Sequence, residues 1–286
     1  MPSQHYLDIN SQLLEFIRGN VELSVALGLP DHLGKLGDPS LAASGREIER
    51  ASKISESIDD SLGESFDERL DLSLIKLYLK QWIAFETLAI NGRPRRVQKP
   101  SGVDGISAGV FQLFVNDERD ASERLDNILT RLESAPDYLR EELAVLDTPV
   151  RRWRDIELAQ ASGLPELFQS IADWARDTDF PRREEMDSAI SRANEGLDNY
   201  CRSLESLPVV EQFAIGREQM DTLLELKQLG KTPEALRHMA ADYMAETQSQ
   251  LEELRRRLLE KYGLAADTSL EALHDLLNER YAVPLK

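Results

Sequence analysis

The cluster Arg151, Arg152, Trp153 and Arg154 has the residue types best suited to chemistry in this sequence. Guanidinium groups form forked hydrogen bonds to carboxylates, and the cluster lies near the start of a predicted helix. It is therefore a candidate site for an anion or for the carboxylate end of a peptide. The alternative is that Trp153 packs inward while its neighbours pair with nearby carboxylates.

The spacing of histidines and carboxylates does not indicate a metal centre. The four histidines are scattered, and none forms the His-Glu-x-x-His pair that binds zinc. Only Glu271 and His274 have the Glu-x-x-His spacing of carboxylate-bridged metal bundles, which need two such pairs. The sequence also lacks a nucleophile elbow, a phosphate-binding loop and a dinucleotide fingerprint. We therefore predict no metal, no cofactor and no catalytic residue for the isolated chain.

The spacing of apolar residues predicts an all-α protein, a multi-helix array of packed antiparallel helices with no significant sheet. Leu125, Ile128, Leu129 and Leu132 follow the i, i+3, i+4, i+7 pattern that lines one face of a helix. Short polar residues that can accept the free amide hydrogens of a first helical turn precede several stretches: Ser44, Asp120 and Thr232.

Residues 90–109 interrupt the helical pattern because they are rich in glycine, proline and arginine. We expect an N-terminal helical section at residues 1–92 and a linker loop at 93–108. A C-terminal helical section at 109–286 is expected to pack on the first as one structural unit. Arg93, Arg95 and Arg96 could hold an anionic group, but a solvated loop is the simpler interpretation.

The charge of the chain limits the classes of partner. Fifty-two acidic and thirty-four basic residues give a net charge of −18, which repels nucleic acid and anionic lipid. No stretch approaches the roughly 18 apolar residues of a membrane span, and the first residues do not read as a signal peptide. We expect neither nucleic acid nor membrane as a partner, and a cytoplasmic location.

A resemblance to a known family rests on two long stretches, residues 125–168 and 189–224. The second contains a Phe-x-x-Gly-x-Glu passage, in which Phe213, Gly216 and Glu218 carry the match. The chain resembles the bacterial family called domain of unknown function 885, and these three residues are its signature turn. In physical terms, Gly216 permits the turn into a new helix, with Glu218 favourably placed in the first helical turn.

The resemblance implies a function that depends on a second half. Full-length members of the family are similar to zinc metallopeptidases, and their second half carries a His-Glu step followed by Pro-Gly-His and a further carboxylate. The present sequence contains nothing of that kind. The chain would then be a helical, non-catalytic half that shapes a substrate cleft or binds a partner, either a catalytic second half or another protein chain.

Two other interpretations remain open. The chain could be a free-standing helical protein that binds a peptide or a protein in one selective groove. It could also be an enzyme of another class on the same scaffold, using the Arg151 to Arg154 cluster with Asp155 and Glu157. The interpretation as a non-catalytic half predicts a large apolar surface for a partner, whereas the free-standing protein predicts a well-covered surface. The enzyme interpretation predicts an enclosed pocket with titratable groups of shifted pKa.

Overall fold

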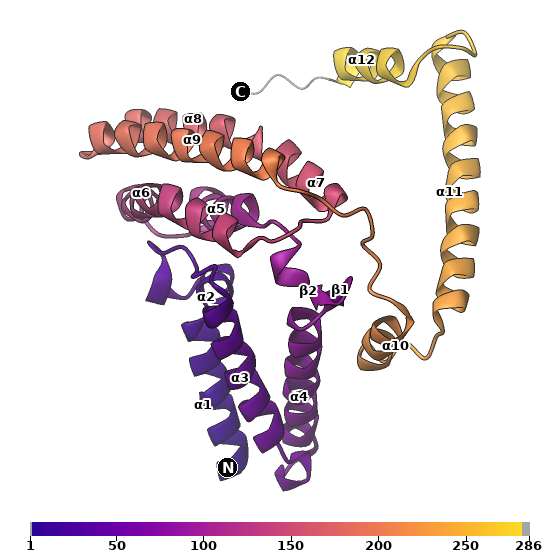
Figure 1. The fold of residues 1–286 in the computed structure, drawn as a ribbon. Coiled ribbons are helices and arrows are strands. Elements are labelled where there is room, and N and C mark those ends of the chain that lie inside the picture. Colours follow the sequence, from indigo (N-terminus) through magenta and orange to yellow (C-terminus); the bar gives the residue numbers. More distant parts are fainter. Residues whose placement is uncertain (1, 282–286) are drawn as a thin grey trace. The chain divides into compact units, whose positions relative to one another are not determined.

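The protein is all-α, as the sequence predicts, in a computed structural model that describes residues 2–281 (Figure 1). None of the helices in this part of the chain combines the length and the apolar composition that a membrane span requires. The first helices are α1 (Gln4–Gly19), α2 (Val21–Ala26), α3 (Leu41–Ser57), α4 (Phe66–Glu86), α5 (Gly102–Phe111) and α6 (Ala121–Val145). They are followed by α7 (Arg151–Ala161), α8 (Leu164–Asp177), α9 (Arg183–Ser206), α10 (Arg217–Leu226), α11 (Pro233–Tyr262) and α12 (Leu270–Tyr281).

The remaining elements are short. A two-residue hairpin pairs β1 (Ala89–Ile90) with β2 (Arg93–Pro94), and its turn residues Asn91 and Gly92 both have positive φ. This is the combination that a tight hairpin turn favours. The short helical turns are η1 (Pro30–His32), η2 (Asp60–Leu62), η3 (Arg95–Val97) and η4 (Gln112–Asn116).

The chain divides into two compact units, of which the first ends at Lys227 and the second begins at Gln228. The boundary between the units therefore lies inside residues 109–286. The segment 93–108, predicted as a linker loop, contains β2, η3 and the first part of α5. Its arginines are thus attached to regular structure within the first unit.

The first unit contains two hydrophobic cores. Helices α1, α3 and α4 run side by side and enclose the smaller core (Figure 1). The larger core lies between α5, α6, α8 and α9, with α6 and α9 packed along each other. The predicted stripe of α6 is at its centre, because the four leucine and isoleucine side chains named above are fully buried.

Helix α5 packs unusually closely on its neighbours because three of its residues are glycines. A Cβ atom on Gly105 would lie 2.0 Å from Tyr138 Oη, and one on Gly109 would lie 1.8 Å from Arg131 Nη1. A Cβ on Gly102 would also meet a side chain, at 2.9 Å. The glycines that made this segment look like a loop therefore form the face of a buried helix.

Polar caps begin several helices, as the sequence analysis proposed. The side chains of Asp120 and Thr232 accept the backbone N–H of Glu123 and Ala235 respectively, so both predicted caps are confirmed. Ser44 lies inside α3, and the cap of this helix is Ser40. A polar residue followed by glutamate is therefore not sufficient to locate a helix start.

Candidate functional site

The first unit contains a pocket of about 850 Å³. Its walls come from the α1–α2 junction, the loop before α3, α3 itself, the end of α4, the segment after the hairpin, and helices α5 and α6. The volume falls in the range of small-molecule sites. Titratable side chains of both signs line the pocket, including Glu22, Glu47, Glu86, Arg95, Arg96 and Arg131.

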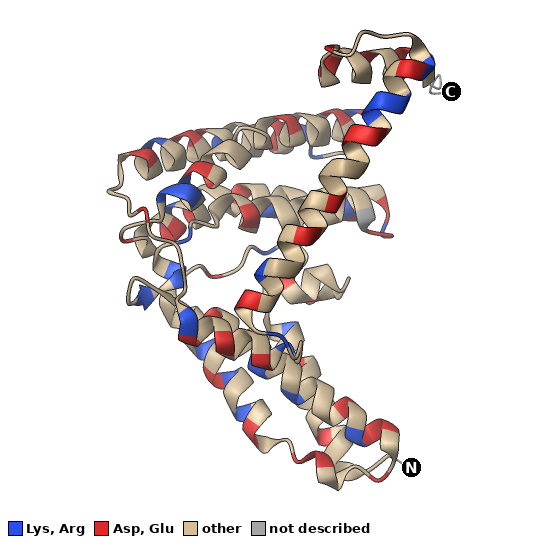
Figure 2. Cartoon of the chain, turned by 90° about the vertical axis from the view of Figure 1, so that its right-hand side faces the viewer, with Lys and Arg blue, Asp and Glu red and all other residues tan. Residues whose placement is uncertain are grey.

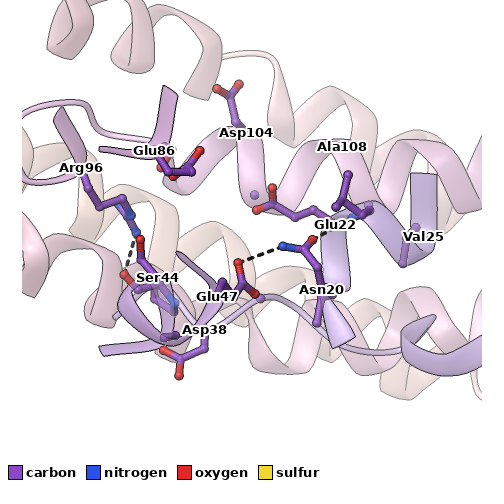
Figure 3. A pocket seen from close by; sticks show the side chains of 18 of the residues that line it. Asn20, Glu22, Val25, Asp38, Ser44, Glu47, Glu86, Arg96, Asp104 and Ala108 are labelled. Atoms are coloured by element: carbon purple, nitrogen blue, oxygen red, sulfur yellow. Dashed lines mark hydrogen bonds between the residues drawn. The ribbon is translucent and has the colours of Figure 1, made fainter. Parts of the chain in front are cut away.

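One wall is organised by Asn20, which lies between α1 and α2. Its Oδ1 accepts the backbone N–H of Leu23 and caps α2, while its Nδ2 donates to Glu47 Oε2 at 2.9 Å. Glu22 lies in the first turn of α2, beside this pair (Figure 3). Because α2 begins directly after α1 ends, the cap residue places two carboxylates from different helices at one wall.

The opposite wall holds arginines that already have partners. Arg96 donates to Glu142 Oε1 at 2.9 Å and to the carbonyl of Pro39 at 2.7 Å. Arg95 stacks over the ring of Phe85, 4.1 Å from its centroid. It also pairs with Glu86 at 3.4 Å. These two arginines, a possible anion site in the sequence analysis, are therefore held by the protein itself.

The ionised forms of two pocket carboxylates, Glu22 and Glu47, are electrostatically unfavourable. Burial raises the pKa of Glu22, and Glu86 adds to the rise by repulsion, although attraction to Arg96 opposes it in part. Burial likewise raises the pKa of Glu47, and repulsion from Glu22 and Glu86 adds to it, although the Asn20 hydrogen bond opposes this. Glu22 keeps solvent-accessible surface even though protein atoms surround it, as expected for a side chain in a hollow.

The raised pKa of Glu22 predicts a pH-dependent stability. Its ionised form is disfavoured in the folded state, so this contribution is fully present below the unfolded pKa and is lost as pH rises through the folded pKa. We expect Glu22→Gln to become more stable than the wild type as pH increases from 4 to 8. The difference should stay below about 1 kcal/mol because water reaches the group.

Urea unfolding at several pH values measures this difference. Glu49→Gln is the matched control on α3, because Lys53 lowers the pKa of Glu49 and its removal should change stability in the opposite direction. Stability curves of Glu22→Gln and wild type that run parallel with pH would contradict the assignment.

The basic cluster named from the sequence lies on the first turn of α7. Arg151 pairs with Glu211 at 2.5 Å and Arg154 with Asp155 at 2.8 Å. Trp153 is half-buried, while Arg152 lies over the ring of Phe213, 5.4 Å from its centroid. The guanidinium groups of Arg151 and Arg154 thus form ion pairs within the protein. None of the four residues of the cluster lines the pocket.

The proposed signature turn contacts this cluster through Phe213. Gly216 is the N-cap of α10 with φ +83° and ψ 169°, a conformation essentially restricted to glycine. Glu218 follows in the first turn of α10. The structure therefore brings the predicted signature turn and the predicted basic cluster together through Phe213 and Arg152, which are far apart in the sequence.

Replacing Gly216 by alanine should destabilise the protein by about 1–3 kcal/mol, because the backbone angles are strained for any residue with a Cβ. Nothing lies near enough to clash, so the effect isolates backbone strain. Gly163→Ala is the control, since Gly163 has an ordinary φ of −87°. Equal denaturation midpoints for the two variants would show that position 216 tolerates a side chain.

Sequence reasoning missed the pocket residues Glu22, Glu47 and Arg131. A signal existed for Arg131, because Arg131, Ala135, Tyr138 and Glu142 follow the helical i, i+4, i+7, i+11 spacing. All four are buried, and two of them, Arg131 and Glu142, are charged. Charged residues on the buried face of a helix indicate a polar site next to that face. No local signal marks Glu22 or Glu47, since their role depends on how α2 and α3 approach each other. In the described residues, no cluster of His, Cys, Asp and Glu could hold a metal ion.

Comparison with known proteins places this chain in a family. Residues 22–285 match the family described as Bacterial protein of unknown function (DUF885), and the chain belongs to it. No curated protein matches the sequence.

The fold also matches a solved structure from Shewanella oneidensis, described as a lipoprotein candidate of unknown function. The TM-score is 0.66 at 17% sequence identity, so the likeness concerns the fold. The match covers 99% of this chain and 53% of the other, so this chain spans about half the length of the Shewanella protein.

Proposed function

We propose that this chain is the helical, non-catalytic half of a metallopeptidase-like protein, and that it binds a second polypeptide with which it shapes a substrate cleft. The observation that carries the proposal is an apolar stripe on α11. Met239, Tyr243 and Leu254 are 54%, 71% and 50% exposed. Their spacing puts them on one side of the helix. Several large exposed apolar side chains along one helix favour an interaction site.

Within the second unit, α12 covers only a small part of α11. Leu259 and Leu273 are buried, and both lie near the end where the two helices meet. Helix α11 has 30 residues and α12 has 12, so most of the α11 stripe extends past its neighbour. A long amphipathic helix is stabilised mainly by packing of its apolar face, which favours a partner for this stripe.

The chemistry of the partner follows from what borders the stripe. Acidic Asp242 and Glu246 lie along one edge of it, and acidic residues recur along α11 (Figure 2). A complementary surface would be apolar with a basic rim. The Shewanella protein is about twice as long as this chain, which supports a partner corresponding to the remaining half of that architecture. The metal and the residues that activate water would belong to this partner.

Binding calorimetry with proteins encoded beside this gene tests the interface. We expect one of them to bind the chain, and Tyr243→Asp to raise the dissociation constant at least about tenfold, as for a central aromatic contact. Ser249→Asp introduces the same charge at a polar position of α11 and should bind like wild type. A complex that tolerates Tyr243→Asp, or the absence of any binding partner among these proteins, would contradict the proposal.

A second candidate is a free-standing protein that binds a small ligand or a peptide. The pocket of about 850 Å³ in the first unit favours it, since it lies entirely within that unit and needs no other chain to form its walls. Its carboxylates of raised pKa also match the feature expected for an enzyme of another class. However, the Arg151 to Arg154 cluster, which that interpretation requires, does not line the pocket.

A further inference from the structure

The charges that line the pocket do not all have partners. Four pairs are satisfied within the protein: Arg96 with Glu142, Arg95 with Glu86, Arg46 with Asp38, and Lys99 with Asp104. Among the described residues, Glu22 has neither a hydrogen bond nor an ion pair, and Glu47 has only the amide of Asn20. Arg131 has no carboxylate within ion-pair distance in the described part of the chain. Arg50 also lines the pocket without an ion pair, but it donates to the carbonyl of Glu15 and its charge offsets part of that of Glu47. Two carboxylates and the buried Arg131 are thus left without an ion pair.

The open negative charge lies where Glu22 and Glu47 approach each other. The two carboxylates repel, and their neighbour Glu86 is only partly neutralised by Arg95 at 3.4 Å. An ammonium or guanidinium group between Glu22 and Glu47 would relieve this repulsion and form charge-assisted hydrogen bonds. Trp82 lines the same pocket, and aromatic rings attract organic cations.

The open positive charge belongs to Arg131 on α6. Only 2% of this residue is exposed, and burial lowers its pKa to about 10. Its Nε and Nη2 donate to the carbonyls of Leu33 and His32, and these hydrogen bonds hold one side of the guanidinium group in place. Its Nη1 lies against Gly109 on the α5 wall and has no hydrogen-bond acceptor among the described residues. A buried guanidinium without a counter-charge is unfavourable unless an anion joins it.

The open charges of opposite sign come from different helices, Glu22 from α2, Glu47 from α3 and Arg131 from α6. Among the described residues no ion pair joins Arg131 to either carboxylate, since its hydrogen-bond partners are the carbonyls of Leu33 and His32. A ligand that meets both must therefore carry its opposite charges on a chain of several atoms. The volume of the pocket accommodates such a molecule with space for more.

We propose that this pocket binds a basic amino acid, free or as the end residue of a short peptide. Its cationic side chain lies between Glu22 and Glu47, and its carboxylate reaches Arg131. The inference goes beyond the proposed partnership with a second polypeptide and does not require that polypeptide. Its test uses the chain alone, so failure here leaves the partner assay unaffected.

Isothermal calorimetry of the full chain with four probes tests the proposal. L-arginine carries both charges, agmatine lacks the carboxylate, and L-citrulline replaces the guanidinium by a neutral group of the same shape. Gly-Gly-L-arginine presents the same residue at the end of a peptide. We expect agmatine and citrulline to bind at least about tenfold more weakly than the best arginine-containing probe, since each loses one charge-assisted contact.

Two variants locate the site. Glu22→Gln should raise the dissociation constant of the arginine-containing probe at least about tenfold and reduce its preference over citrulline. Glu49→Gln, on the same helix as Glu47 but outside the pocket, should leave binding unchanged. Because Glu22 retains solvent-accessible surface, its replacement is expected to fold, and unfolding curves verify this.

Each outcome of these titrations either identifies the form of the ligand or overturns the proposal. Tighter binding of L-arginine than of the tripeptide assigns a free amino acid, and the reverse assigns a peptide end. The proposal is overturned if neither binds at about 10 mM, a concentration above any specific dissociation constant expected for such a site. Equal affinities for arginine, agmatine and citrulline, or an unchanged affinity in Glu22→Gln, would overturn it as well.

Discussion

Replacement of Glu142 by alanine is expected to lower the free energy of unfolding by about 3–5 kcal/mol, because it leaves the charge of Arg96 unpaired in the protein interior. The carboxylate is fully buried and the Arg96 side chain is only 17% exposed. Glu142 Oε1 also accepts hydrogen bonds from the backbone N–H and the hydroxyl of Ser101, at 3.0 and 3.1 Å. These bonds anchor the residue that precedes α5, so the loss should also loosen this wall of the pocket.

Urea denaturation measures the effect, and the same helix supplies a control. Asp137 pairs with Arg140 on the exposed side of α6, where both side chains are about 70% exposed. Asp137→Ala should therefore cost no more than about 1 kcal/mol. A Glu142→Ala variant as stable as Asp137→Ala would show that the buried pair is not a structural support of the pocket.

Gly105→Ala is expected to destabilise the protein by about 3 kcal/mol, the upper part of the range for inserting an atom into a packed core. The added Cβ would lie 2.0 Å from Tyr138 Oη and 2.6 Å from its Cζ, so the ring must move. This direction is opposite to the usual one, since alanine in place of glycine normally stabilises a helix interior.

A matched glycine on another helix separates the two effects. Gly45 lies inside α3 with no atom within 4 Å of an added Cβ, and Gly45→Ala should raise stability by about 0.5–1 kcal/mol. Tyr138→Phe removes the closest atom and should recover part of the loss in Gly105→Ala. If Gly105→Ala raises stability as Gly45→Ala does, the close packing of α5 on α6 is wrong.

Much of the fold could be predicted because it depends on local patterns. The apolar stripe of α6, from Leu125 to Leu132, and the caps Asp120 and Thr232 are set by neighbours within one or two helical turns. Helix α5 could not be predicted in the same way. Its glycines weaken the local preference for a helix, and only the side chains of α6 that press on them explain their presence.

The candidate site was less predictable than the fold because its groups come from distant positions. Asn20 and Glu47 are 27 residues apart, and Arg96 and Glu142 are 46 apart. The sequence suggested Arg95 and Arg96 as free cations in a loop, whereas tertiary structure pairs them with carboxylates. Conversely, the Arg151 to Arg154 cluster was a predicted site, yet Arg151 pairs with the distant Glu211 and Arg154 with its neighbour Asp155. Proximity in sequence is thus a poor guide to which charges remain available.

The proposed partnership is tested most directly by zinc content and peptidase turnover on a mixed peptide library, measured for the purified chain alone and with the products of neighbouring genes. We predict that the chain alone holds no zinc and cleaves no peptide, and that turnover appears when a binding partner is added. Zinc binding or turnover by the unaided chain would contradict its assignment as a non-catalytic half, and silence in every mixture would contradict the partnership itself.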